Sequence, residues 1–107
     1  MLFRSPSGTA IMLANAVNSE FGDSYSYEYD RHSKRTKRTK NEIGIHSVRG
    51  GTIVGEHDVI FAGRDEVITL SHQATSKEVF AVGAIRAAKF IASKNAGLYD
   101  MNDVMSF

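Results

Sequence analysis

Residues 5–10 (SPSGTA) are the first stretch of this chain whose residue types could do chemistry. Ser5 and Pro6 suit the cap and first turn of a helix, and an apolar helical pattern begins at Ala10. The first amides of a helix have no partner within it, and the helix dipole there favours negative charge. Because Gly8 has no side chain, a ligand can approach its backbone closely. The stretch therefore predicts a helix start that holds a carboxylate or a phosphate.

Residues 30–40 (DRHSKRTKRTK), the basic segment, form a second candidate site with six basic residues and one acidic residue. The whole chain has a net charge of only +1, so the remainder is mildly acidic. Three interpretations stay open: nucleic-acid binding, a solvated loop without a role, or contact with a dianion held at the helix start. Nucleic-acid binding ranks last, because no nucleic-acid motif accompanies the segment.

The Glu56-His57-Asp58 triplet could suggest acid–base or metal chemistry. It falls in a predicted strand, where neighbouring side chains point to opposite faces, so His57 is separated from both acids. Subunit packing or hydrogen bonding is therefore the favoured role of His57. His46 and His72 are interpreted in the same way, and no metal site is predicted.

Length and composition indicate one globular domain covering residues 1–107. The chain is 42% hydrophobic and 23% charged, and it has no cysteine, which excludes disulfides and thiolate metal sites. It has no apolar run long enough to span a membrane and no signal-peptide pattern. These features favour a cytoplasmic protein.

Periodicity and turn signals predict two helices and four strands. Tight Gly50-Gly51 and 63–65 turns are expected to join the last three strands, and a Thr75–Glu78 capping box is expected to start the second helix. The predicted fold class is α+β: a four-stranded, mainly antiparallel (mixed) sheet with two helices on one face. The predicted elements are helix 7–21, strand 25–29, strand 43–48, strand 53–62, strand 67–74 and helix 75–93, followed by a turn-rich tail.

The predicted strand 53–62 is apolar on both of its faces, through Ile53, Val54, Val59, Ile60 and Phe61. Such a strand is buried on both faces, but two helices cover only one face of a sheet. The other face is therefore expected to pack against a second copy of the chain or another domain.

Four motifs resemble, in order and spacing, the C-terminal domain of dihydrodipicolinate reductase (4-hydroxy-tetrahydrodipicolinate reductase). They are SPSGTA, EIGIHSVRGGTIVGEHDVIFAG, ITLSHQATSKEVFAVGAIRAAKFI and GLYDMNDV, and RGGTIVGEH and GLYDM are the most specific parts. The resemblance covers nearly the whole chain from Ser5. It implies a homotetrameric enzyme, assembled through the open sheets of this domain, that reduces a cyclic dicarboxylate with NADH or NADPH on the route to diaminopimelate and lysine.

The resemblance also implies roles for individual residues. Gly8 and Thr9 match positions that bind a substrate carboxylate, and Ser7 accompanies them. Weaker matches are Lys77 and Phe80, near the nicotinamide, and Arg31, His32 and Arg38, on a loop near the active site that offers anion contacts.

The chain departs from the family pattern just before Ser7. The family has a His-His-x-x-Lys-x-Asp stretch there, but its Lys falls at Leu2, its Asp at Arg4 and its histidines before Met1. No GxGxxG motif follows a strand, so we expect this chain to lack the dinucleotide-binding domain that the family carries N-terminal to this one. We therefore expect a substrate-binding and tetramerisation domain that binds no cofactor and is inactive alone. The alternative is a non-catalytic anion-binding or scaffold module that uses residues 31–40.

Overall fold

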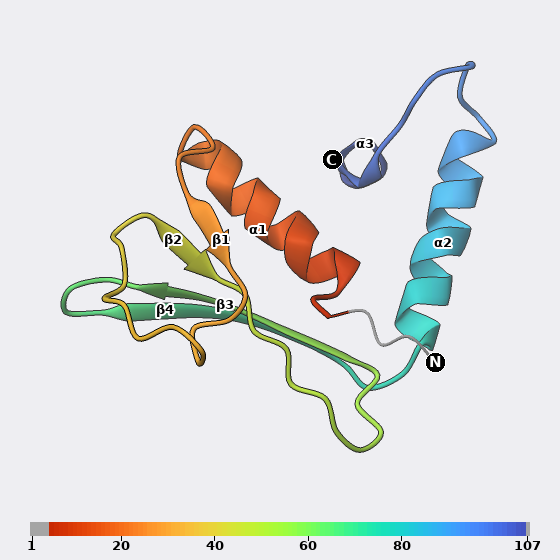
Figure 1. The fold of residues 1–107 in the computed structure, drawn as a ribbon. Coiled ribbons are helices and arrows are strands. Elements are labelled where there is room, and N and C mark those ends of the chain that lie inside the picture. The colour runs from red at the N-terminus through yellow and green to blue at the C-terminus, as the bar shows by residue number, and fades with distance from the viewer. Residues whose placement is uncertain (1–4, 107) are drawn as a thin grey trace. The chain divides into compact units, whose positions relative to one another are not determined.

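The computed structural model describes residues 5–106, so positions Leu2 and Arg4 lie outside the described part. The chain is α+β, as predicted (Figure 1). Its elements are α1 (Gly8–Glu20), β1 (Ser26–Glu28), β2 (Glu42–Gly44), β3 (Gly55–Ala62), β4 (Val67–Ala74), α2 (Glu78–Ile91) and α3 (Met101–Met105).

The described strands form two separate two-stranded sheets, so the prediction of a single four-stranded sheet is wrong. β1 pairs with β2 in parallel, with Tyr27 opposite Ile43, and β3 pairs with β4 as a hairpin. The predicted tight hairpin at Gly50-Gly51 is also wrong, because β2 ends at Gly44 and residues 45–54 are not strand. Strands must run up to a two-residue turn for it to join them as a hairpin.

Contacts between residues divide the described chain into two compact units, one with residues 5–52 and 57–71 and the other with residues 53–56 and 72–106. In the first unit, α1 begins as predicted near Ser7, which is its N-cap with φ −72° and ψ 154°. Ser5 and Pro6 precede the cap, contrary to the expectation that they form the cap and first turn. After α1, Gly22 adopts a φ of +65°, a conformation that glycine enters readily.

Asn18 on α1 joins the helix to the chain that enters β1. Its side chain is buried, its Oδ1 accepts from the Tyr25 amide at 3.0 Å, and its Nδ2 donates to the Tyr25 carbonyl at 3.0 Å. The Tyr27 hydroxyl donates to Asn15 Oδ1 at 2.6 Å. Polar contacts therefore fix how β1 lies along α1, beside a small apolar core that includes Ala14.

The second unit contains α2 and α3. The predicted Thr75–Glu78 capping box is wrong: α2 begins at Glu78, and the Glu78 amide donates to Ser76 Oγ at 3.1 Å. Thr75 directly follows β4, so it lies too early to cap this helix. The predicted turn-rich tail contains α3, where Asp100 forms a capping box with Asp103.

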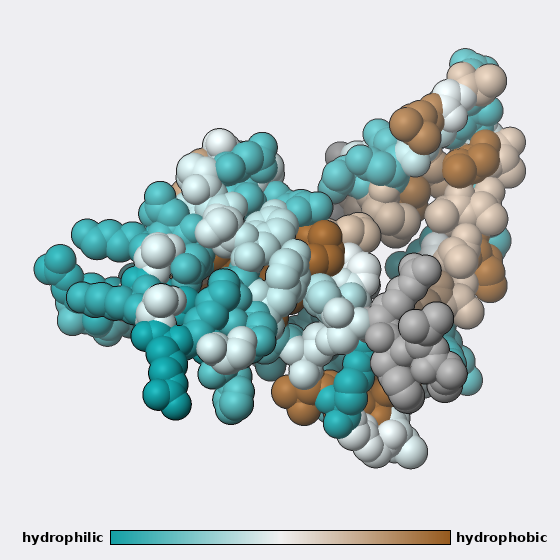
Figure 2. Space-filling view, viewed as in Figure 1, coloured by the Kyte–Doolittle hydropathy of each residue, from teal (hydrophilic) through white to brown (hydrophobic). Residues whose placement is uncertain are grey.

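Apolar side chains of the hairpin and of α2 are largely exposed, and Figure 2 shows tan and brown surface over α2. The buried apolar residues of the described part are Ala14, Ile45 and Ala74. The prediction that a second copy or another domain covers one face of the third strand stays a prediction. The exposed residues include Ile60, Phe61, Val67, Ile68 and Leu70 on the hairpin, and Val79, Phe80, Val82, Ile85 and Ile91 on α2.

No helix within residues 5–106 has the length and apolarity needed to cross a membrane.

Candidate functional site

The N-terminus of α1 presents backbone amides beside an open surface. Gly8 and Thr9 are exposed, and a Cβ added at Gly8 would meet no atom within 4 Å. Ser7 is half-buried, and its Oγ accepts a hydrogen bond from the Ala10 amide at 3.2 Å. The first turn carries no acidic residue that would repel an anion. The helix start can therefore receive a carboxylate on its free amides.

His57 reaches this helix start from β3. Its Nε2 lies 3.2 Å from Ser7 Oγ, and both residues are half-buried in the same compact unit. The contact agrees with hydrogen bonding as the role of His57. Sequence reasoning did not identify Ser7 as its partner, because the two residues are 50 positions apart and no local pattern connects them.

The first basic residues of the basic segment, Arg31 and Lys34, are paired with acidic side chains. Lys34 Nζ donates to Glu28 Oε2, and Arg31 Nη1 lies 3.6 Å from Glu42 Oε2. Arg31 Nη2 also donates to the Thr36 carbonyl at 3.0 Å. The hydrogen bond from Lys34 holds the pKa of the buried Glu28 carboxyl below its usual value, with the Asp30 amide contributing.

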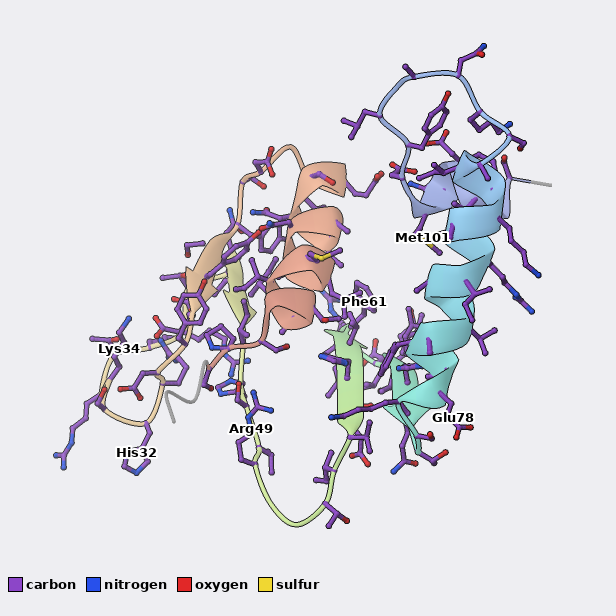
Figure 3. All side chains as sticks on the ribbon, turned by 90° about the vertical axis from the view of Figure 1, so that its right-hand side faces the viewer. His32, Lys34, Arg49, Phe61, Glu78 and Met101 are labelled. Atoms are coloured by element: carbon purple, nitrogen blue, oxygen red, sulfur yellow. The ribbon has the colours of Figure 1, made fainter. Side chains whose placement is uncertain are left out.

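The remainder of the basic segment is exposed, and Figure 3 shows His32 and Lys34 on the loop after β1. No hydrogen bond or ion pair among residues 5–106 joins Arg31, His32 or Arg38 to the start of α1. Of these three candidate anion contacts, Arg31 is already held by Glu42. Within the basic segment, the exposed cations that form no ion pair with another described residue are Arg35, Lys37, Arg38 and Lys40.

The two candidate cofactor-proximal residues lie in the second unit, at the start of α2. Lys77 is the N-cap of α2, and its side chain makes no capping hydrogen bond. Phe80 is about half exposed, and its Cζ lies 4.0 Å from where a Cβ would stand at Gly55. Residues 5–106 contain no group of three His, Cys, Asp or Glu side chains that could hold a metal ion.

Comparison with known proteins places this chain in a family. The family described as "Dihydrodipicolinate reductase, C-terminus" matches residues 3–105. The chain is 57% identical over 101 residues to the 4-hydroxy-tetrahydrodipicolinate reductase of Caldanaerobacter subterraneus subsp. tengcongensis, covering 94% of the chain and 40% of that protein.

Two further relatives carry the same name. The reductase of Staphylococcus epidermidis is 56% identical over 100 residues, which cover 94% of this chain and 41% of the relative. That of Clostridium tetani is 51% identical over 102 residues, which cover 95% of this chain and 40% of the relative. The chain thus spans about two-fifths of the length of these relatives. The resemblance seen in the motifs is confirmed, and the chain belongs to the family of dihydrodipicolinate reductase C-terminal domains.

Proposed function

We propose that this chain is the substrate-binding and homotetramerisation domain of a cytoplasmic 4-hydroxy-tetrahydrodipicolinate reductase. That enzyme carries out a step of diaminopimelate and lysine biosynthesis that depends on NADH or NADPH. The observation that carries the proposal is the open helix start at Gly8 and Thr9, in a chain that belongs to this family. We further propose that residues 1–107 form one domain of the longer enzyme.

The helix start would hold one carboxylate of the cyclic dicarboxylate. The Gly8 and Thr9 amides would donate to its oxygens, and the helix dipole would stabilise its charge. Hydrogen bonds to a charged acceptor are stronger than neutral ones, so two amides can fix the orientation of a small rigid ring. Fixing the ring sets the position of its reducible bond relative to a hydride donor.

The described residues do not fit a dinucleotide cofactor. Dinucleotides bind at a strand–helix turn within a βαβ unit, but the parallel strands β1 and β2 are connected by residues 29–41, which contain no helix. We therefore propose that the nicotinamide is held outside this chain, and we assign neither hydride transfer nor proton donation to its residues. The isolated chain is expected to show no turnover with NADH or NADPH, and measurable turnover would contradict this proposal.

The β3–β4 hairpin offers a surface for assembly into the proposed tetramer. The Gly63 amide donates to the Glu66 carbonyl at 2.9 Å, and Gln73 donates to Glu56. Both contacts follow one antiparallel register, which places Phe61 opposite Ile68 and Val59 opposite Leu70. These four apolar side chains share one face of the hairpin, and Leu70 is 61% exposed. His57 of the same face contacts Ser7 within the chain, and a second copy would bury the part that Phe61, Ile68 and Leu70 leave exposed.

A non-catalytic anion-binding or scaffold module is the second candidate function. It is favoured by Arg35, Lys37, Arg38 and Lys40 of the basic segment, which are exposed and form no ion pair with any of residues 5–106. In this case the ligand would contact residues 31–40 and leave the start of α1 unaffected. A polyanion bound in this way would dissociate as salt is added.

Titration of the isotope-labelled chain with pyridine-2,6-dicarboxylate separates the two functions. The substrate-domain proposal expects amide shifts at Gly8 and Thr9, whereas shifts confined to residues 31–40 favour the scaffold module. Gly8→Leu should weaken binding about tenfold by covering the open backbone. The matched control is Gly50→Leu, at an exposed loop glycine with equally open space, and it should leave the affinity unchanged. Equal loss in both variants would contradict a carboxylate site at Gly8.

A further inference from the structure

Ser7 Oγ stands between two nitrogen atoms at the start of α1. The Ala10 amide nitrogen and His57 Nε2 each lie 3.2 Å from it. We propose that His57 is a positioning residue: its Nε2–H donates to Ser7 Oγ and leaves the Ser7 hydroxyl proton free to donate to the carboxylate at the helix start. This inference rests on the proposed function, because it assigns a role at the same substrate-binding site.

The donor inventory of Ser7 leaves two arrangements. A hydroxyl has one proton to donate and two lone pairs that accept. The Ala10 amide can only donate, so it occupies one lone pair of Oγ. If the hydroxyl donates to His57 Nε2, its single proton is used within the protein. If Nε2–H donates instead, Oγ accepts two hydrogen bonds and its proton remains available.

The chemistry of the ligand selects between these arrangements. A carboxylate has acceptor atoms only, so Ser7 can contribute to binding only as a donor. Ser7 directly precedes the amides of Gly8 and Thr9, so its hydroxyl is well placed to become a third donor to the same anion. The Nε2–H tautomer of His57 is therefore the binding-competent form, and ligand binding should stabilise it.

The position of His57 on β3 suits this role. Along residues 55–59 the exposure alternates, with His57 half-buried and Glu56 and Asp58 exposed. The two flanking carboxylates therefore lie on the other face and do not compete to accept from Nε2. A ring carried by a strand is also held more precisely than one carried by a loop. The strand can thus set the direction of the Ser7 hydroxyl although the two residues are far apart in sequence.

The test uses the full 107-residue chain and pyridine-2,6-dicarboxylate as the probe, at one pH above the imidazole titration range. His57→Leu should weaken binding about tenfold, and Ser7→Ala should weaken it equally. The double variant should bind no more weakly than either single variant, because both remove the same donor. His57→Gln, whose amide can donate from a similar position, should retain the affinity of the wild type within about twofold.

His46→Leu is the matched control, because it removes an exposed histidine of the same unit and should leave the affinity unchanged. Long-range ¹H–¹⁵N spectra of the wild-type chain report the tautomer of His57 independently of any variant. With the probe bound at Gly8 and Thr9, Nε2 of His57 should be protonated.

An unprotonated Nε2 in the bound state, or a His57→Leu variant that binds as the wild type does, would overturn the role of His57 and leave the proposed function intact. Additive losses in the double variant would overturn it as well. Absence of any binding by the wild-type chain would overturn both the carboxylate site and the role of His57.

Discussion

The β1–β2 sheet and the β3–β4 sheet are both two-stranded, but they differ in whether their side chains find partners within this chain. Beside β1–β2, the buried Asn18 closes hydrogen bonds with Tyr25, and the buried Glu28 is paired with Lys34. On β3–β4, apolar side chains such as Phe61 and Leu70 remain exposed. The first sheet has its partners within this chain, whereas the second leaves apolar side chains exposed that the proposed oligomer would bury. The comparison teaches that hydrogen bonds within the chain fix the first sheet, whereas the exposed apolar residues of the second suit the proposed assembly.

The largest expected effect is on the apolar hairpin. Leu70→Glu would place a charge in the proposed subunit interface, and burial of an unpaired charge costs several kcal/mol. The dissociation constant of the oligomer should rise at least about 100-fold, which light scattering across a concentration series would measure.

Thr69→Glu is the control for this variant, because Thr69 lies on the same strand with its side chain on the opposite face. It should change the assembly far less than Leu70→Glu. Equal dissociation in the two variants, or a wild-type chain that stays monomeric at high concentration, would show that this face does not drive assembly.

The next largest effect is on the polar contact of β1. Asn18→Ala would leave the amide and carbonyl of Tyr25 without their partner, which should lower the free energy of unfolding by about 2–4 kcal/mol. Asn15→Ala removes an exposed hydrogen bond on the same helix and should cost about 0.5–1 kcal/mol. Urea denaturation of both variants measures the difference. If Asn18→Ala costs no more than Asn15→Ala, the sheet is not fixed by this side chain.

A smaller effect should appear in the free energy of unfolding, which should depend on pH through Glu28 of the same sheet. The hydrogen bond from Lys34 lowers the pKa of Glu28 from its usual value of 4.5, so the folded state binds a proton less readily than the unfolded state does. The stabilisation is complete above the unfolded pKa and is lost as the pH falls through the lower folded pKa. The stability advantage of the wild type over Glu28→Gln should therefore shrink as the pH is lowered below 4.5.

Asp30 provides an internal reference for that experiment. Its pKa is also lowered, chiefly by the hydrogen bond from Ser33, and this contribution is present in both proteins and cancels in the comparison. If the difference in free energy of unfolding between the wild type and Glu28→Gln stays constant from neutral to acidic pH, the Glu28–Lys34 pair does not stabilise the fold.

The smallest effect is expected at the polar end of the hairpin. Gln73 donates to Glu56 between exposed side chains, and exposed pairs of this kind contribute little. Gln73→Ala should change the free energy of unfolding by less than about 0.5 kcal/mol in urea denaturation. A loss comparable with that of Asn18→Ala would mean that the two sheets do not differ in the way proposed.

The sequence predicts best those elements that local rules determine. The strand 67–74 is predicted with its observed bounds, since turn residues precede it and helix signals follow it. The helix start near residue 7 is also predicted, because an apolar helical pattern begins at Ala10, although the capping hydroxyl belongs to Ser7 and not to Ser5. Thr75–Glu78 shows the limit: the spacing is that of a capping box, yet the chain around Thr75 is still leaving β4.

Contacts between distant residues could not be predicted in this way. The parallel pairing of Tyr27 with Ile43 depends on how residues 29–41 return the chain, and alternation alone does not determine strand direction. Likewise, the pattern puts His57 on one face of a strand but does not identify Ser7 as its partner. The family match supplies the functional context that composition and spacing leave open.

The parallel pairing of β1 with β2 has a consequence for folding kinetics. Residues 29–41 must close as a loop before Tyr27 can meet Ile43, and this loop carries the concentrated positive charge of the basic segment. In the unfolded chain, mutual repulsion adds to the entropic cost of closure. Added salt screens that repulsion and so speeds closure, yet it also weakens the ion pairs of Arg31 and Lys34 in the folded chain. The same ions that help this sheet to form thus weaken two of the ion pairs beside it once it has formed.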